Sequence, residues 1–349
     1  MPFLLSPSRV LRPFALALLA IACGEMLIHL LGTNGRFNTD FFDFSPLRPD
    51  VMQKHALYDK FELLFQDTPT DIVQIGDSSG FYGVIPAEVT AGADGSSYLN
   101  LGAFADTRWE GYYEAAVMAV RRPARPRMLV LHITPFWGPV STAWAPGLAE
   151  LMHNYLVQEM WWHRVRPPSA GYRLRLTNLV YHDLWLDDFP YDKPADQPGY
   201  PSLRRWREEM AATRGWVPLP RAYPDKYLTA PTMLSCEIEH SYSSTSWFGL
   251  YRDDALYRSL SRMAGLARQH GLRFALITNP LPCRMDDRVL ADDVARQLER
   301  FRRDYPDAIV PFDFFRTAER SDFMDRWHLT QAAAILHSRR IGQALRTAR

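Results

Sequence analysis

The chain has 349 residues, a formal net charge of +1 and a sequence pI near 7.8. Its length suits one large domain or a domain that carries a substantial insertion. The 40 basic residues are scattered among 39 acidic ones, so no basic face is available for nucleic acid. The composition excludes a nucleic-acid-binding protein and indicates a globular one.

The first predicted element is an apolar helix over residues 13–32, "PFALALLAIACGEMLIHLLG". About 20 residues in a helix span about 30 Å, the thickness of a hydrocarbon core. Arg9 and Arg12 precede the stretch, and no Lys or Arg follows until Arg36. The positive-inside rule then places the N-terminus in the cytoplasm and the main domain outside it. We expect an uncleaved signal anchor, that is, a single-pass transmembrane segment.

Two other interpretations of this segment stay open. A cleaved signal peptide has a shorter apolar region, and Cys23 after "AIA" loosely resembles a lipidation signal. Glu25 and His29 lie one turn apart on the same face of the helix. They either satisfy each other near the outer interface or form a docking face for another membrane protein.

Cysteine is scarce, with 3 residues in the chain. Beyond Cys23 there are Cys236 and Cys283, which are too few and too far apart for a zinc site. In an oxidising compartment they can form one disulfide. We expect no metal and no cofactor.

After the anchor, strand-like apolar runs alternate with helical patterns, which is typical of a parallel sheet flanked by helices. Strands are predicted at 71–76, 97–101, 127–133, 272–278 and 308–313, and helices at 106–121, 252–270, 287–304 and 330–346. The alternation predicts an α/β fold with a five-stranded parallel sheet.

The domain boundaries follow from this pattern. Residues 1–35 contain the anchor, 36–70 an extended linker with a helix around 52–65, and 71–349 the α/β domain. The alternation stops after the third strand, and we assign an insertion to 135–246 with short helices near 146–162 and 202–213. The insertion is rich in Trp and Tyr, which either stack on sugars or form a small core.

The first predicted strand ends in "DIVQIGDSSG", residues 71–80. Small residues directly after a buried strand turn the chain sharply and leave a hydroxyl exposed, which suits a nucleophile. The same residues are also common in ordinary turns. Ser79, next to Ser78, is expected to point in a different direction.

A second motif, "FMDRWHLT", stands just before the last predicted helix. Asp325 lies three residues before His328, close enough to accept from the Nδ1–H of the ring and to leave Nε2 free as a base. Such pairs also occur by chance ahead of helices. Together with the serine motif, however, they supply a nucleophile, a base and an orienting acid in one α/β domain.

With these residues the chain resembles the SGNH/GDSL hydrolase superfamily over about 71–346, the insertion excepted. "IGDSSGFYGV" is similar to the first sequence block of that family, "NLGAFADTRWEG" to the second and "DRWHLT" to the last. The resemblance implies a three-layer fold, Ser78 as nucleophile, and Asp325 and His328 as the other triad members. It also implies that the backbone N–H groups of Ser78 and Gly102 form an oxyanion hole.

The third block of the family, Gly-x-Asn-Asp, is replaced by "HITPFWG". His132 or Thr134 could supply the missing donor, and Asn279 in "ITNPLP" follows the next predicted strand. The loss of one oxyanion donor costs a few kcal/mol of transition-state stabilisation, so an efficient enzyme needs a substitute.

The anchor, the insertion and the missing third block together resemble the membrane-anchored branch of this superfamily. That branch is similar to alginate O-acetylation proteins and to the teichoic-acid D-alanine transfer protein, and it implies a bacterial inner-membrane protein with a periplasmic domain. It also implies acyl transfer to an exported polysaccharide beside a membrane-bound O-acyltransferase. Two alternatives remain: a carbohydrate esterase with the same triad, and an inactive SGNH-fold subunit that binds glycans or acts as a scaffold.

Overall fold

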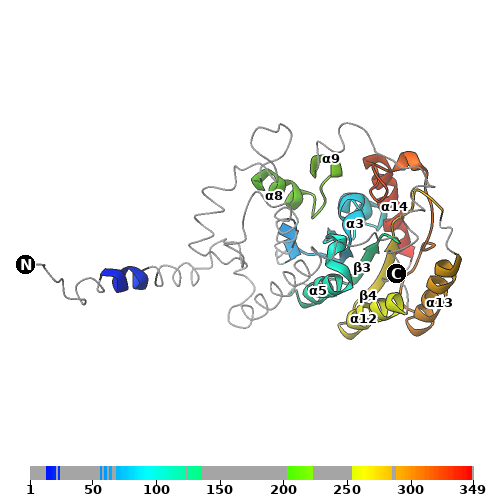
Figure 1. Ribbon diagram of the computed structural model, residues 1–349, viewed down its shortest axis with the longest axis horizontal. Coiled ribbons are helices and arrows are strands. Elements are labelled where there is room, and N and C mark those ends of the chain that lie inside the picture. The colour runs from blue at the N-terminus through cyan, green and yellow to red at the C-terminus, as the bar shows by residue number, and fades with distance from the viewer. Residues whose placement is uncertain are drawn as a thin grey trace, which may run out of the picture.

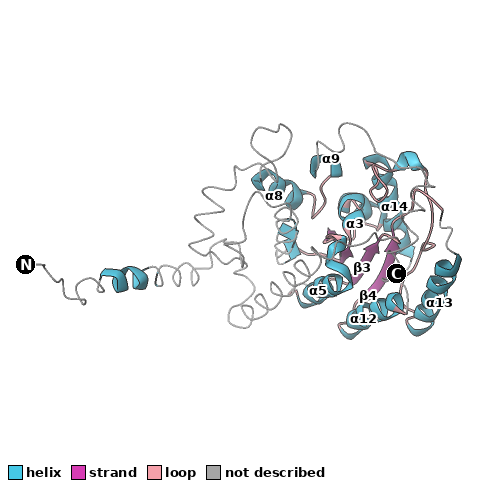
Figure 2. Cartoon of the chain, in the orientation of Figure 1, coloured by secondary structure: helices cyan, strands magenta, loops and turns pink. Residues whose placement is uncertain are grey.

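The computed structural model describes residues 13–20, 23, 56, 59, 60, 63, 64, 68–122, 125–135, 203–222, 254–284 and 288–347. Within them the chain forms a mixed α/β domain around a parallel sheet (Figure 1). In the view of Figure 2, strands β3 (Met128–Ile133) and β4 (Arg273–Thr278) lie between helices α12 (Ala255–Gln269) and α14 (Gln331–Thr347).

The sheet has four strands in the described part of the chain, in the order β2-β1-β3-β4. The strands are β1 (Ile72–Gly76), β2 (Tyr98–Asn100), β3 (Met128–Ile133) and β4 (Arg273–Thr278), and every pair is parallel. β1 lies between β2 and β3, with Gln74 opposite both Asn100 and Val130. The carboxyl ends of all four strands therefore meet at one edge of the sheet.

The expected fifth strand, at 308–313, does not form in the described chain. This segment pairs with β4 only through a parallel bridge between Ala275 and Ile309. Pro311 follows two residues later and has no N–H to donate to a ladder, which limits pairing at this edge. The prediction of five strands is thus reduced to four strands and a bridge.

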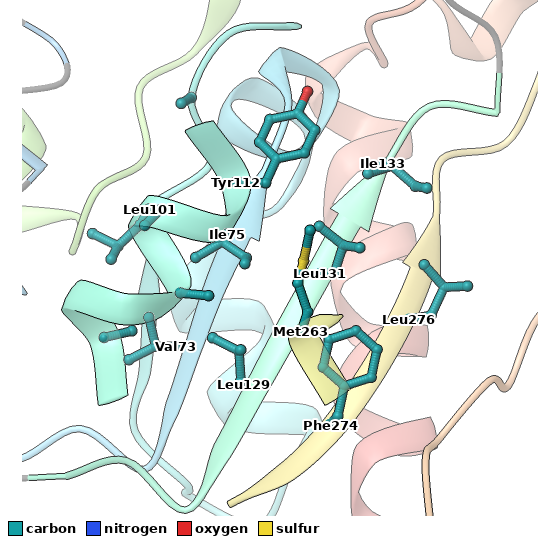
Figure 3. Packing of buried hydrophobic residues seen from close by; sticks show 14 of the residues in the cluster. Val73, Ile75, Leu101, Tyr112, Leu129, Leu131, Ile133, Met263, Phe274 and Leu276 are labelled. Atoms are coloured by element: carbon teal, nitrogen blue, oxygen red, sulfur yellow. The ribbon is translucent and has the colours of Figure 1, made fainter. Parts of the chain in front are cut away.

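Alternate residues of each strand face opposite sides of the sheet, as the two-residue period requires. One core joins strand residues to helices α5 (Arg108–Arg121), α12 and α13 (Arg288–Asp304), as Figure 3 shows for Tyr112 and Met263. Its strand residues include Val73, Leu129, Leu131 and Phe274. The intervening strand residues pack against helices α4 (Pro86–Gly92) and α14 in a second core, which contains Ile72, Val130, Ile277, Val89 and Ile341. The domain is therefore built in three layers.

The described helices are α3 (Ser78–Gly83), α4 (Pro86–Gly92), α5 (Arg108–Arg121), α8 (Leu203–Ala212), α9 (Leu219–Ala222), α12 (Ala255–Gln269), α13 (Arg288–Asp304) and α14 (Gln331–Thr347). Two 3₁₀ turns, η1 (Ala105–Thr107) and η4 (Arg320–Asp322), accompany them. The four helices predicted after the second strand correspond to α5, α12, α13 and α14. Helices α3 and α4 were not predicted, because their "SSGFYG" and "PAEVTAG" sequences contain glycines and lack a helical repeat of apolar residues.

Part of the insertion packs against the edge strand β2. The N–H of Asn100 donates to the carbonyl of Arg214 (3.0 Å), and the Arg214 Nε donates to the carbonyl of Tyr98 (2.9 Å). Trp216 is buried and donates from Nε1 to the Tyr82 carbonyl (2.8 Å), so this tryptophan is a core residue. Helix α8 matches the expected helix at 202–213, whereas the one expected at 146–162 lies outside the described residues.

The structure describes only 13–20 and 23 of the expected anchor, so Glu25 and His29 lie outside it. None of the helices in the described ranges combines the length and the apolar character that a membrane crossing requires. Cys23 is a free thiol and Cys283 is disulfide-bonded, while Cys236, the residue expected to pair with it, is not among the described residues.

Candidate active site

The turn after β1 explains the Gly-Asp-Ser order of the first motif. Gly76 has a φ of +130°, and a Cβ at this position would lie 1.8 Å from the carbonyl oxygen of His132 on the neighbouring strand. Only glycine fits such a backbone next to another strand. Asp77 follows as the N-cap of α3, and Ser78 is the first residue of that helix.

The Asp77 side chain is fully buried and accepts hydrogen bonds from two segments of the chain. Its Oδ1 accepts from the N–H and the hydroxyl of Ser79 and from the N–H of Gly80, while its Oδ2 accepts from the N–H of Thr134 after β3. Burial raises the pKa of Asp77, and these hydrogen bonds act in the opposite direction. The carboxylate thus ties the start of α3 to the end of β3.

Ser78, His328 and Asp325 form a hydrogen-bonded row. The Ser78 Oγ lies 3.0 Å from Nε2 of His328, and Nδ1 of the same ring lies 2.9 Å from Oδ2 of Asp325. A carboxylate only accepts, so Nδ1 carries the hydrogen and Nε2 can accept from the serine hydroxyl. Oδ1 of Asp325 also accepts from the N–H groups of Trp327 and His328, at 2.8 Å each. The side chains of His328 and Asp325 are 12% and 14% exposed, so the row is close to solvent.

Tyr82, one turn after the serine in α3, packs its ring edge-on to the His328 ring, with the centroids 5.5 Å apart. This contact and the hydrogen bond from Nδ1 to Asp325 together restrict the orientation of the imidazole. The structure therefore brings together the three residues that the sequence motifs predicted for a triad, across 250 positions of the chain.

The backbone N–H groups predicted for the oxyanion hole differ in their partners. The N–H of Ser78 has no acceptor among the described residues, as expected for the first residue of a helix. The N–H of Gly102 donates to Oδ1 of Asn100 (2.8 Å), and that of Thr134 donates to Asp77, so both are already engaged. The N–H of Ala105, which begins η1 after β2, makes no hydrogen bond within the described chain.

The other two candidates for the missing donor have different partners. Asn279 is buried and donates from Nδ2 to the carbonyl of Trp327 (2.8 Å), the residue before His328. His132 is also buried, and its ring bonds Ser79 and His337. Asn279 therefore supports the Asp325–His328 loop, and His132 contacts the start of helix α3.

Asn100, the last residue of β2, is a structural residue of this site that the sequence analysis did not single out. Its Nδ2 donates to the carbonyls of Gly80 and Val84 at 2.8 Å each, and so caps the C-terminal end of α3. Buried Lys60 bonds the Asn100 carbonyl at 3.2 Å and lies 3.6 Å from the centre of the Phe81 ring. The signal in the sequence that could have identified Asn100 is its position as a polar residue at the end of a predicted strand, because buried amides need hydrogen-bond partners.

Comparison with protein-family models, with curated proteins and with solved structures found no match to this chain. Within the described ranges, no group of three or more His, Cys, Asp or Glu side chains is arranged to hold a metal ion. A hydroxyl bonded to an imidazole that is itself bonded to a carboxylate can deliver a serine nucleophile to a carbonyl carbon.

Proposed function

We propose that this chain is a serine enzyme that transfers an acyl group through an acyl-serine intermediate on Ser78. The observation that carries the proposal is the continuous row of hydrogen bonds from Ser78 through His328 to Asp325, at 3.0 and 2.9 Å. The three-layer α/β fold and the position of Ser78 directly after β1 are further support for membership of the SGNH/GDSL superfamily.

In the first step, Ser78 Oγ attacks the carbonyl carbon of an ester while its proton passes to Nε2 of His328. The same proton then leaves with the departing alcohol as the acyl–oxygen bond breaks. An acceptor hydroxyl next gives its proton to Nε2 and attacks the acyl carbon, and this proton passes to Ser78 Oγ as the acyl–serine bond breaks. Asp325 keeps the imidazole in the required tautomer and stabilises its cationic form.

The negative oxygen of each tetrahedral intermediate requires donors that are not already engaged. We assign this role to the N–H of Ser78 and, as second donor, to the N–H of Ala105. Both have no acceptor within the described chain, and both follow strands whose carboxyl ends lie side by side in the sheet. In this proposal Ala105 replaces Gly102 and Thr134, whose N–H groups bond Asn100 and Asp77.

The acceptor that we propose is a hydroxyl of an exported polysaccharide, and acetyl is the acyl group. The apolar segment 13–32 with its flanking charges supports a membrane-anchored, periplasmic enzyme, beside a membrane-bound O-acyltransferase that supplies the acyl group. The hydrogen-bonded triad favours a catalyst over an inactive scaffold. Water as acceptor would make the same site a carbohydrate esterase.

The test uses the full chain in detergent with p-nitrophenyl acetate and a fluorophosphonate probe. Wild-type protein should be labelled on Ser78 and should release nitrophenol, and Ser78→Ala should remove the label and lower turnover by about a thousandfold or more. Ser321→Ala, at an exposed serine of η4, is the matched control and should behave as wild type. An unlabelled wild-type protein, or a Ser78→Ala variant of full activity, would overturn the proposal.

The acceptor is tested in the same assay by adding an acetyl-free oligosaccharide. Transfer predicts an acetylated sugar at the expense of free acetate, whereas acetate alone in the presence of the sugar identifies an esterase.

A further inference from the structure

A row of polar side chains, buried except for the half-buried Arg316 at one end, packs against the helix that carries Ser78 and takes no part in the triad. Its members are Arg316, His337 of α14, His132 of β3, and Ser79 and Asp77 at the start of α3. Each of the last four is at most 4% exposed.

The contacts form one continuous chain. An Nη2 of Arg316 lies 2.9 Å from His337 Nδ1, and the two Nε2 atoms of His337 and His132 lie 3.1 Å apart. His132 Nδ1 lies 3.4 Å from the Ser79 Oγ, the longest link, and this hydroxyl lies 2.5 Å from Oδ1 of Asp77. A half-buried arginine is thereby connected to a buried carboxylate through three neutral groups.

The direction of every hydrogen bond in this row follows from its two ends. Arginine can only donate, so His337 Nδ1 has no hydrogen and its Nε2 carries one. His337 Nε2–H donates to His132 Nε2, which fixes the hydrogen of the second imidazole on Nδ1. That Nδ1–H donates to the Ser79 oxygen, and the Ser79 hydrogen is left for the Asp77 carboxylate, which can only accept.

Protonation of His132 would place two hydrogens between the facing Nε2 atoms, and protonation of His337 would place a hydrogen on Nδ1 against the Arg316 donor. Either event would break the chain. Burial and the charge of Arg316 lower the pKa of His132 to about 3, and both causes also lower the pKa of His337. Both rings are therefore neutral at pH 7, as the row requires.

The row ends on the group that fixes the start of α3. Asp77 precedes Ser78 and holds the N–H groups of Ser79, Gly80 and Thr134. Asp77 is the N-cap of α3, so a change in the orientation of its carboxylate would alter the contacts that hold the first turn of this helix, where Ser78 lies. The row is therefore placed to act on the nucleophile without touching it.

We infer that His132 and His337 are positioning residues. Because Arg316 fixes the donor and acceptor directions of both rings, the row keeps the Asp77 carboxylate in one orientation and so holds Ser78 toward His328. The functional part of this inference rests on the proposed acyl transfer, whereas the hydrogen positions do not. A polar row of this kind is costly to bury, and replacement by apolar residues often leaves stability unchanged, so a structural role alone does not explain it.

The hydrogen positions are tested first, by ¹⁵N NMR of the imidazole rings in the full chain, with His132→Gln and His337→Gln used for assignment. At pH 7 the spectra should show His337 protonated on Nε2 alone and His132 on Nδ1 alone. Any other pair of tautomers, or a doubly protonated ring, would overturn the inference. This measurement does not depend on activity, so it separates failure of the row from failure of the proposed function.

The positioning role is tested by hydrolysis of p-nitrophenyl acetate. His337→Leu breaks the row and should lower kcat about ten- to a hundredfold with little change in KM, the cost of a slightly misplaced nucleophile. His337→Gln keeps one donor and one acceptor at the same spacing and should stay within about threefold of wild type. Leu345→Ala, at a buried position of the same helix, controls for lost stability and should leave kcat unchanged.

A smaller change covers the case in which His337→Leu does not fold. Ser79→Ala removes one oxygen atom from the row and should also lower kcat, by about tenfold. Its control is Ser338→Ala, which removes an equally buried hydroxyl that bonds Ile85 and Ala334 instead. Equal kcat values for Ser79→Ala and Ser338→Ala, or for His337→Leu and His337→Gln, would show that the row does not position Ser78.

Discussion

Asn279 shows how a single buried amide can hold the loop that carries the proposed base. It follows β4 and donates from Nδ2 to the carbonyls of Trp327 (2.8 Å) and Pro280 (3.1 Å). Trp327 directly precedes His328, so this bond holds the loop that carries the proposed base. The sequence offered Asn279 as an oxyanion donor, and the structure gives its hydrogens to backbone carbonyls.

Asn279→Ala should therefore lower kcat for p-nitrophenyl acetate about ten- to a hundredfold and leave KM nearly unchanged, because His328 loses its alignment with Ser78. Thr278→Val is the matched control. Thr278 is also buried, but its hydroxyl bonds the carbonyl of Asp313, away from the catalytic loop. A control that lost as much kcat as Asn279→Ala would contradict the assignment.

At the scale of elements, the contact between the insertion and β2 depends on one glycine. Gly215 has a φ of +95°, and a Cβ there would lie 2.0 Å from the carbonyl oxygen of Asn100. The flanking Arg214 and Trp216 bond Tyr98 and Tyr82, so the segment covers an edge strand that would otherwise expose unpaired groups.

Gly215→Ala should lower the free energy of unfolding by about 2–5 kcal/mol, since backbone strain and overpacking add. Gly271→Ala isolates the strain, because Gly271 has a φ of +71° and nothing within 4 Å of the added Cβ. We expect this control to lose only about 1 kcal/mol in urea unfolding. If both variants lost the same free energy of unfolding, the backbone at Asn100 would have to move aside for the added methyl group, and the close contact would not matter.

At the scale of the whole molecule, the buried histidines make stability depend on pH. His132 has a folded-state pKa of about 3 against 6.5 in the unfolded chain, and that of His337 is also well below 6.5. At pH values between the folded and the unfolded pKa, the unfolded state binds more protons than the folded state. The stabilisation from these neutral histidines is therefore fully present above pH 6.5 and is lost as the pH falls below it. The groups that face the pair are Arg316, Arg340 and Ser79, and the two arginines act in the same direction as burial.

Urea unfolding of the wild-type protein should therefore show a free energy that falls between pH 6.5 and 5 by about 1 kcal/mol per pH unit for each histidine. The raised pKa of Asp77 acts in the opposite sense. His337→Gln should reduce this dependence of the unfolding free energy on pH by the contribution of one histidine, about 1 kcal/mol per pH unit. An unchanged dependence would contradict the neutral, buried state of His337.

The sequence by itself determined the local features of this protein. Apolar runs located the four strands, "GDSSG" marked the turn after β1, and the Asp325–His328 spacing anticipated a bond between residues three apart. Each of these depends on neighbours in the chain, whose geometry is limited by backbone sterics and by helical or strand periodicity.

The tertiary structure alone decided which remote groups meet. It placed Ser78 3.0 Å from a histidine 250 residues away, engaged the N–H of Gly102 with Asn100, and paired His132 with His337. Whether a buried donor finds an acceptor depends on segments that only folding brings together, because the great majority of buried polar groups are satisfied by whatever lies beside them.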